Sequence, residues 1–138
     1  MIRQSARSGR YKVLLVDDDA TVLRSLAAAL EFDLDVEPCS SAERALSLLE
    51  TGEFHVVCSD YSMPGMNGVE LFERVAKLPF PVACLLLTGA SAFIERQSST
   101  EHYVLTKPVD PARLSGLLTR LAQTAELKRY AGRDRAAR

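Results

Sequence analysis

The stretch 56-VVCSDYSMPGMNG-68 decides the fold and raises the question of function. It opens with an apolar run, Val56 to Cys58, of the kind that forms a fully buried strand. It ends in a loop rich in Gly, Pro and Met, which by itself is ordinary turn chemistry. Between the two stands Asp60, which is a solvated loop residue, a helix cap, or a carboxylate whose charge is used. The choice depends on what else the fold brings to this edge.

The segments on either side alternate between strand and helix patterns. Short apolar or β-branched runs predict strands at 12–17, 35–39, 55–60, 81–88 and 103–107. Apolar residues at helical spacing predict helices at 20–32, 41–52, 67–78 and 110–130, with Asp19, Ser40 or Ser41, and Asp110 as N-caps. The segment 89–102 is polar and weakly patterned, so any helix there should be short and marginal.

This alternation indicates an α/β fold, a doubly wound parallel sheet of five strands with helices on both faces, because right-handed crossovers place the helices there. In such folds, ligands bind outside the carboxyl ends of the strands. The residues at those ends are Asp17, Asp18, Asp19, Asp60, Thr88 and Lys107. We therefore expect all of them at one edge of the sheet.

Together, these side chains predict a phosphoryl-transfer site. Crowded carboxylates repel one another unless a cation joins them, and an all-oxygen site suits Mg2+. Lys107 could pair with a phosphoryl group and Thr88 could donate a hydrogen bond to it. Asp60 could then act as a nucleophile and form an aspartyl phosphate. Taken singly, each residue has a structural interpretation as a turn, cap or strand end, and it is their order at successive strand ends that favours the site.

Composition limits the other classes of function. The chain has 138 residues, 47% of them hydrophobic and 25% charged, which is typical of one ordinary globular domain. A net charge of -1 gives no global field that would favour nucleic acid or an anionic membrane. The apolar runs are too short for a bilayer and residues 1–10 lack a signal-peptide core, so we expect a cytoplasmic protein with a flexible leader at 1–10. Cys39, Cys58 and Cys84 lack the spacing of a zinc site and are expected as buried, reduced thiols.

Four segments together resemble the receiver domain of two-component response regulators, the CheY-like family. They are 13-VLLVDDDATVLRSL-26, 56-VVCSDYSMPGMNGVEL-71, 85-LLLTGA-90 and 104-VLTKPVD-110. The resemblance covers 11–127 and implies a flavodoxin-like sheet with strand order 2-1-3-4-5. Residues 128–138 would follow it as a basic C-terminal tail or linker.

The resemblance also implies roles for the matching residues. Asp60 would be the phosphoacceptor, and Mg2+ would be held by Asp17, Asp18, Asp60 and the backbone carbonyl of Ser62. Thr88 and Lys107 would contact the phosphoryl group with help from the Gly89 amide, and Pro108 occupies the usual cis-peptide position of the family. No catalysis is expected beyond self-phosphorylation from a phosphodonor and autodephosphorylation.

A histidine kinase or histidine phosphotransfer protein would be the phosphodonor partner. A face built from 89–104 and the last helix would pass the signal to an output domain or effector protein, and a homodimer through this face is a further expectation. No direct contact with nucleic acid or membrane is expected.

Two features depart from the family pattern. Receivers usually carry Tyr or Phe three residues before the lysine, as a switch that turns inward with the Thr. Here that position is Val104, and Tyr103 lies one residue earlier, where strand alternation faces it the other way. The interval from Thr88 to Lys107 is also short for the family, so the fourth helix of the family is expected to be short or disordered.

Two other functional classes stay open. A pseudo-receiver would bind partners without phosphorylation. Val104 and the short 89–102 segment are compatible with this interpretation. An Asp-nucleophile phosphohydrolase of the haloacid-dehalogenase kind is the third interpretation. The first strand ends in 17-DDDAT-21, which compares with the DxDx[TV] motif of those enzymes, but no cap insertion follows.

Overall fold

The computed structural model describes residues 9–89 and 102–137. Within these ranges the strands form one five-stranded sheet with the order β2-β1-β3-β4-β5, in which every pairing is parallel. The strands are β1 (Lys12–Val16), β2 (Asp35–Cys39), β3 (Val56–Asp60), β4 (Ala83–Thr88) and β5 (Tyr103–Thr106). The α/β fold and the strand order predicted above are confirmed. Pro38 lies in β2, an edge strand, where its missing N–H is best tolerated.

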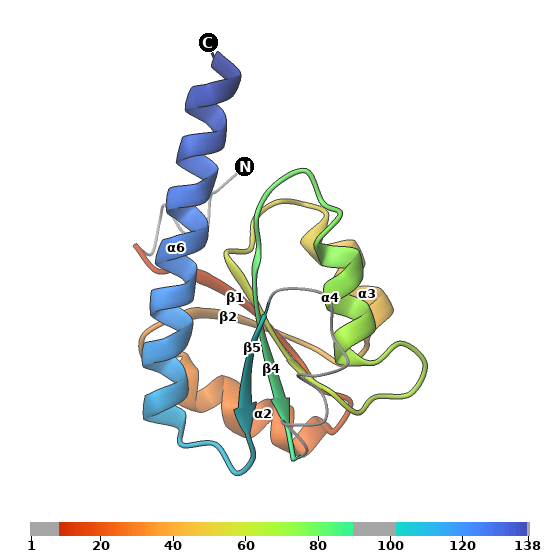
Figure 1. Cartoon of the computed structure of the whole chain (residues 1–138). Coiled ribbons are helices and arrows are strands. Elements are labelled where there is room, and N and C mark those ends of the chain that lie inside the picture. The colour runs from red at the N-terminus through yellow and green to blue at the C-terminus, as the bar shows by residue number, and fades with distance from the viewer. Residues whose placement is uncertain (1–8, 90–101, 138) are drawn as a thin grey trace.

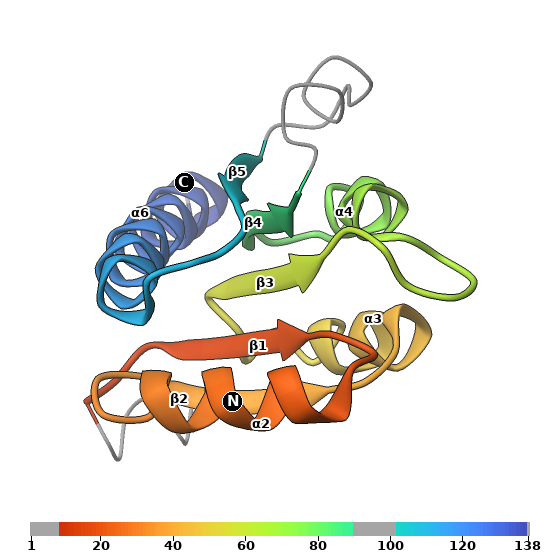
Figure 2. The ribbon, with the colours of Figure 1, turned by 90° about the horizontal axis from the view of Figure 1, so that it is seen from below.

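Helices cover both faces of the sheet. They are α2 (Ala20–Leu30), α3 (Ala42–Leu49), α4 (Gly68–Val75) and α6 (Pro111–Ala137). Helices α2 and α6 lie on one face, and α3 and α4 lie on the other (Figures 1 and 2). The short fourth helix predicted between β4 and β5 falls almost entirely outside the described residues. None of the helices in the described ranges is both long and apolar enough to cross a membrane.

The sheet separates two hydrophobic cores, because successive side chains of a strand point to opposite faces. Leu14, Val57 and Leu86 pack toward α3 and α4, whereas Leu15, Cys58 and Leu85 pack toward α2 and α6. These central strands are buried on both faces, which explains their continuous apolar sequences. All three cysteines are buried thiols, as predicted.

Side-chain caps start the helices close to the predicted positions. Asp19 Oδ1 accepts hydrogen bonds from the backbone N–H groups of Thr21 and Val22, and Ser41 accepts one from Arg44. Asn67 and Glu70 form a capping box at α4. Each cap fixes where the chain turns from a loop at the edge of the sheet into a helix.

Helix α6 is longer than the sequence pattern suggested. It continues through 128–137, the region predicted as a basic tail or linker, and its C-terminal part projects beyond the sheet (Figure 1). Ala, Lys and Arg make up seven of the ten residues 128–137, and all three have high helix propensity.

Candidate functional site

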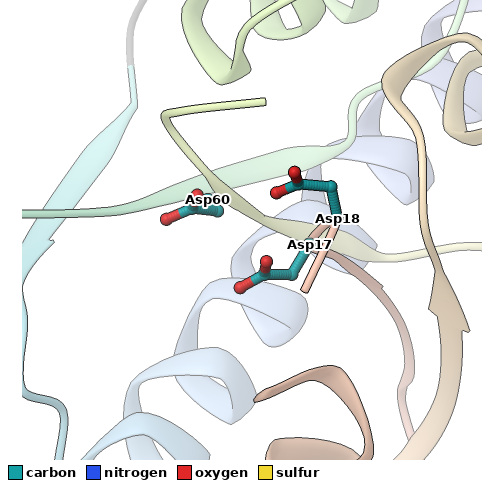
Figure 3. A group of neighbouring side chains, drawn as sticks. All are labelled: Asp17, Asp18 and Asp60. Atoms are coloured by element: carbon teal, nitrogen blue, oxygen red, sulfur yellow. The ribbon is translucent and has the colours of Figure 1, made fainter. Parts of the chain in front are cut away.

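The predicted site residues gather at one edge of the sheet. Asp17 and Asp18 follow β1 directly, Asp60 ends β3, Thr88 ends β4, and Lys107 follows β5. Because the four strands are parallel neighbours, their carboxyl ends lie side by side. Figure 3 shows the three carboxylates at the ends of β1 and β3.

The aspartates form a compact acidic cluster. One carboxylate oxygen from each of Asp17, Asp18 and Asp60 lies within 4.8 Å of the others. Asp17 and Asp60 are buried, with 4% and 8% of their surface exposed, whereas Asp18 is exposed. A set of carboxylate oxygens that opens to solvent on one side fits Mg2+, which takes one or two carboxylates and keeps several waters.

The three consecutive aspartates after β1 do different things. Asp17 Oδ1 accepts a hydrogen bond from the backbone N–H of Asp19 at 2.9 Å, which orients the Asp17 carboxylate. The Asp19 carboxylate caps α2. The predicted N-cap is therefore confirmed for Asp19, whereas the role of Asp17 and Asp18 as metal ligands stays a prediction.

The pKa of Asp17 reflects both its burial and its charged neighbours. Burial raises the pKa of Asp17, and the charges of Asp60 and Asp18 raise it further. The hydrogen bond from Asp19 and the charge of Lys107 oppose this rise without cancelling it. A cation bound here would relieve the repulsion between the carboxylates.

Lys107 supplies a positive charge next to Asp60. Its Nζ lies 2.5 Å from Asp60 Oδ1. Burial alone would lower the pKa of Lys107, but the hydrogen bond to Asp60 and the charges of all three aspartates outweigh it and raise the pKa. The backbone N–H of Lys107 donates to Thr88 O at 2.9 Å, which ties the ends of β4 and β5 together. The Lys107–Pro108 peptide bond is cis, as the family resemblance implied.

The remaining predicted residues lie at the same edge of the sheet. The Thr88 residue is buried at the end of β4. Ser62 and Gly89 are exposed on the loops that follow Asp60 and Thr88. Their contacts with an ion or a phosphoryl group stay predictions.

The structure adds Gly68, whose role the sequence did not reveal. Its backbone N–H donates to Tyr61 O at 3.0 Å, which closes the loop that follows Asp60. A Cβ at Gly68 would lie 2.7 Å from Asp60 O and 2.5 Å from Leu86 Cδ1. The first turn of α4 therefore packs directly against the backbone of the proposed acceptor. In the sequence, 67-NG-68 indicates only a turn or a helix start.

Helix α3 also contacts this loop. Glu43 Oε2 accepts a hydrogen bond from the backbone N–H of Met66 at 3.4 Å. Gly65 adopts a positive φ of 76° beside it, and a Cβ there would lie 3.1 Å from the same oxygen. The loop that carries Ser62 is thus closed between Tyr61 and Gly68 and is also held at Met66 by Glu43.

The two candidate switch residues point to opposite faces of the sheet. Val104 is half-buried and packs against the core under α3 and α4. Tyr103 is 55% exposed and lines a cavity beside Leu121 and Ala125 of α6. The aromatic ring of β5 therefore lies on the α6 side, as strand alternation predicted.

Comparisons with known proteins agree with this geometry. The response regulator receiver domain family matches residues 13–119. An uncharacterized 14.6 kDa protein of Leptolyngbya boryana is 37% identical over 112 residues, which cover 77% of this chain and 86% of that protein. The heme response regulator HssR of Staphylococcus saprophyticus is 35% identical over 124 residues, which cover 85% of this chain and 51% of HssR. The uncharacterized transcriptional regulatory protein YesN of Bacillus subtilis is 28% identical, and the match covers 34% of its length.

Solved structures show the same fold. The signal receiver domain of an HD domain-containing protein from Pseudomonas fluorescens has a TM-score of 0.77 and 27% identity, over 88% of this chain and 93% of that one. A receiver domain protein from Clostridium thermocellum also has a TM-score of 0.77, at 24% identity, over 85% of this chain and 98% of that one. Sheet order, edge chemistry and family match thus point the same way, and the chain belongs to the response regulator receiver domain family.

Proposed function

We propose that this receiver domain is a phosphorylation-controlled switch. It takes a phosphoryl group from a histidine kinase or a histidine phosphotransfer protein onto Asp60. The observation that carries the proposal is the buried Asp60 carboxylate, which belongs to the acidic cluster and also contacts Lys107. A structural carboxylate would need only the lysine, and the two further aspartates add repulsion that a purely structural site would avoid.

In the proposed reaction, an Asp60 carboxylate oxygen attacks the phosphorus of a phosphohistidine. The new O–P bond forms as the N–P bond breaks, and the imidazole nitrogen keeps the electron pair. Asp17, Asp18, Asp60 and the Ser62 carbonyl would hold Mg2+, whose charge stabilises the phosphoryl oxygens when it is bound. The small number of protein carboxylates leaves room for waters and phosphoryl oxygens around the ion.

Lys107 and Thr88 stabilise the product in this proposal. Lys107 Nζ already lies against Asp60 Oδ1 and can pair with a phosphoryl oxygen without leaving the site. Thr88 donates its hydroxyl to another phosphoryl oxygen. Because the Lys107 N–H donates to Thr88 O, a movement of either residue is transmitted to the other. The chemistry ends at the phosphorylated state and its slow self-hydrolysis, so no substrate turnover is expected.

The negative charge that phosphorylation adds at Asp60 drives the proposed conformational change. New acceptor oxygens draw Thr88 and Lys107 inward and reshape the chain after β4. The face formed by 89–104 and α6 then changes its affinity for an output domain, an effector protein or a second copy of the chain. With Val104 in place of an aromatic ring, we propose that the backbone link between β4 and β5 carries this change. The cytoplasm, where histidine kinases present their phosphoryl groups, is the proposed location.

The test is phosphorylation with acetyl phosphate and Mg2+, read as the mass gain of one phosphoryl group. Wild type should gain it, and Asp60→Asn should not. Asp19→Asn is the matched control, since it removes a neighbouring carboxylate, keeps the α2 cap and lies outside the cluster. If Asp60→Asn is labelled as well as wild type, the acceptor is wrong. If wild type takes up neither acetyl phosphate nor beryllofluoride, the pseudo-receiver interpretation replaces the proposal.

A further inference from the structure

The C-terminal part of α6 is not held by apolar packing. The last buried side chain of the helix is Ala125 among the residues whose burial is described. Beyond it, Leu127 and Tyr130 are 69% and 63% exposed. Glu126 and Arg129, one turn apart, are half-buried, and both point back to the amino edge of the sheet.

Arg129 binds three backbone carbonyls at once. Its Nε donates to Pro81 O at 3.0 Å, its Nη1 donates to Gly52 O at 2.8 Å, and its Nη2 donates to Phe54 O. The guanidinium carbon lies 5.1 Å from the centroid of the Phe80 ring, within cation–π range. Two loops are joined by this one group, the α3–β3 loop and the α4–β4 loop.

The arrangement matches the shape of a guanidinium group. Each of the three guanidinium nitrogens has its own acceptor, and a planar fork satisfies all three without reorientation. A lysine ammonium is a compact point charge and cannot reach three carbonyls spread around a plane. The acceptors are held in place, because Gly52 has a φ of 79° and the Phe80 ring packs 3.6 Å from where a Gly52 Cβ would lie.

Glu126 holds the same part of the helix to the residues that directly precede β1 and β3. Its Oε1 accepts a hydrogen bond from the Tyr11 hydroxyl at 3.4 Å, and its Oε2 lies 3.9 Å from His55 Nε2. These distances are longer than those of Arg129, so the Arg129 contacts are the stronger of the two sets.

We propose that the amino edge of the sheet carries a guanidinium-binding site, formed by the carbonyls of Gly52, Phe54 and Pro81 with the Phe80 ring. Arg129 occupies it within the same chain. Occupancy of this site, and not apolar packing, fixes the course of α6 after Ala125. The site lies at the opposite edge from Asp60, so it is independent of phosphorylation.

The experiment measures amide hydrogen exchange of residues 122–132 in the full chain. Arg129→Ala should speed exchange there about tenfold or more, since hydrogen bonds to a charged group are lost. Guanidinium chloride, added at concentrations far below those that unfold proteins, should restore protection in Arg129→Ala. Arg129→Lys should exchange faster than wild type and should not respond to guanidinium. Arg120→Ala, on the exposed face of the same helix, is the control and should behave as wild type.

Three results would overturn the proposal. One is unchanged exchange in Arg129→Ala. Another is equal rescue by ammonium chloride, which would make charge alone responsible. If Arg129→Ala does not fold, Arg129→Lys provides the test instead. Exchange at the wild-type rate in Arg129→Lys would show that the planar guanidinium group is not needed. Beryllofluoride binding should survive in every folded variant, so failure here is separate from failure of the phosphorylation proposal.

Discussion

At the scale of single residues, the site shows a conflict between stability and function. The buried Asp17 carboxylate has a raised pKa, chiefly through burial and then through the charges of its neighbours. A carboxyl group whose pKa is raised in the folded state favours its neutral form there. Its ionised form therefore costs stability at every pH above the folded pKa, including neutral pH. Carboxylates kept at such a cost are typical of functional sites.

Asp17→Asn should therefore stabilise the metal-free protein. The amide keeps an oxygen that can accept the hydrogen bond from Asp19 N–H, and it removes the charge that repels Asp18 and Asp60. The melting temperature in EDTA should rise by a few degrees at pH 7.5. Saturating Mg2+ should raise the melting temperature of wild type and leave the variant unchanged. A lower melting temperature for the variant in EDTA would contradict this account of the cluster.

Gly68 tests how closely α4 must approach the acceptor. In Gly68→Ala the new methyl group meets Asp60 O at 2.7 Å and Leu86 Cδ1 at 2.5 Å, so the helix or the strand has to move. The free energy of unfolding, measured in urea, should fall by about 1–3 kcal/mol. Beryllofluoride binding should weaken as well, because the Asp60 backbone is displaced.

The same substitution at Gly116 is the control. Gly116 lies inside α6 with nothing within 4 Å of its Cβ position. Gly116→Ala should add about 0.5–1 kcal/mol of stability through helix propensity. If both Gly→Ala substitutions change the free energy of unfolding equally, the close approach to Asp60 O does not affect stability.

At the scale of elements, the sequence predicted most of what places the site. Apart from the weaker pattern at 35–39, each strand appeared as a short apolar run, so the strand ends and their carboxylates followed directly. The caps Asp19 and Ser41 were predicted as well, whereas the Asn67 cap was not. Gly68 could not be predicted, since its need arises from the backbone of another segment. The Arg129 site could not be predicted from the sequence either, because its acceptors are backbone carbonyls on two loops remote in sequence. A run such as 126-ELKRYAGRDRAAR-138 is ordinarily a solvated block.

The cap of α4 links helix stability to the loop beside Asp60. Asn67 accepts a hydrogen bond from the Glu70 N–H at 2.9 Å, and the Glu70 side chain accepts one from the Asn67 N–H at 2.9 Å. Asn67→Ala should lower the free energy of unfolding by about 1 kcal/mol. Amide exchange of 61–67 should rise with it, because the loop ends at this cap. Asn67→Ser retains a capping oxygen and should stay close to wild type, and a loss in Ser equal to that in Ala would rule out the cap as the cause.

At the scale of the whole molecule, the two edges of the sheet differ in charge balance. At the amino edge, Lys12 Nζ lies 3.2 Å from Glu53 and 3.9 Å from Glu37, and Arg129 fills its carbonyl site. Lys12 and Arg129 thus each have acceptors within reach at this edge. At the carboxyl edge, three carboxylates face Lys107. The excess of negative charge at this edge is what favours a cation and a phosphoryl group there.

His55 makes the amino edge sensitive to acid. Its Nδ1 accepts a hydrogen bond from the Lys12 backbone N–H at 3.0 Å, and its ring packs edge-on against Tyr11 at 5.2 Å. Burial lowers the pKa of His55, the charge of Arg129 lowers it further, and Glu126 with the Lys12 backbone opposes the shift. The unfolded chain therefore takes up this proton first, at a pKa of about 6.5. Stability is fully present above that pH and is lost as the pH falls below it.

The free energy of unfolding should thus fall between pH 7.5 and pH 5.5, with a slope of at most about 1.4 kcal/mol per pH unit from this group. His55→Gln should be less stable at pH 7.5 and should show a flatter profile, because it has no proton to gain. His102→Gln is the control and should keep the wild-type slope, since it leaves His55 in place. Urea unfolding at a series of pH values provides the measurement. If the free energy of unfolding depends on pH in the same way for wild type and His55→Gln, the acid sensitivity arises from carboxylates elsewhere and not from the amino edge.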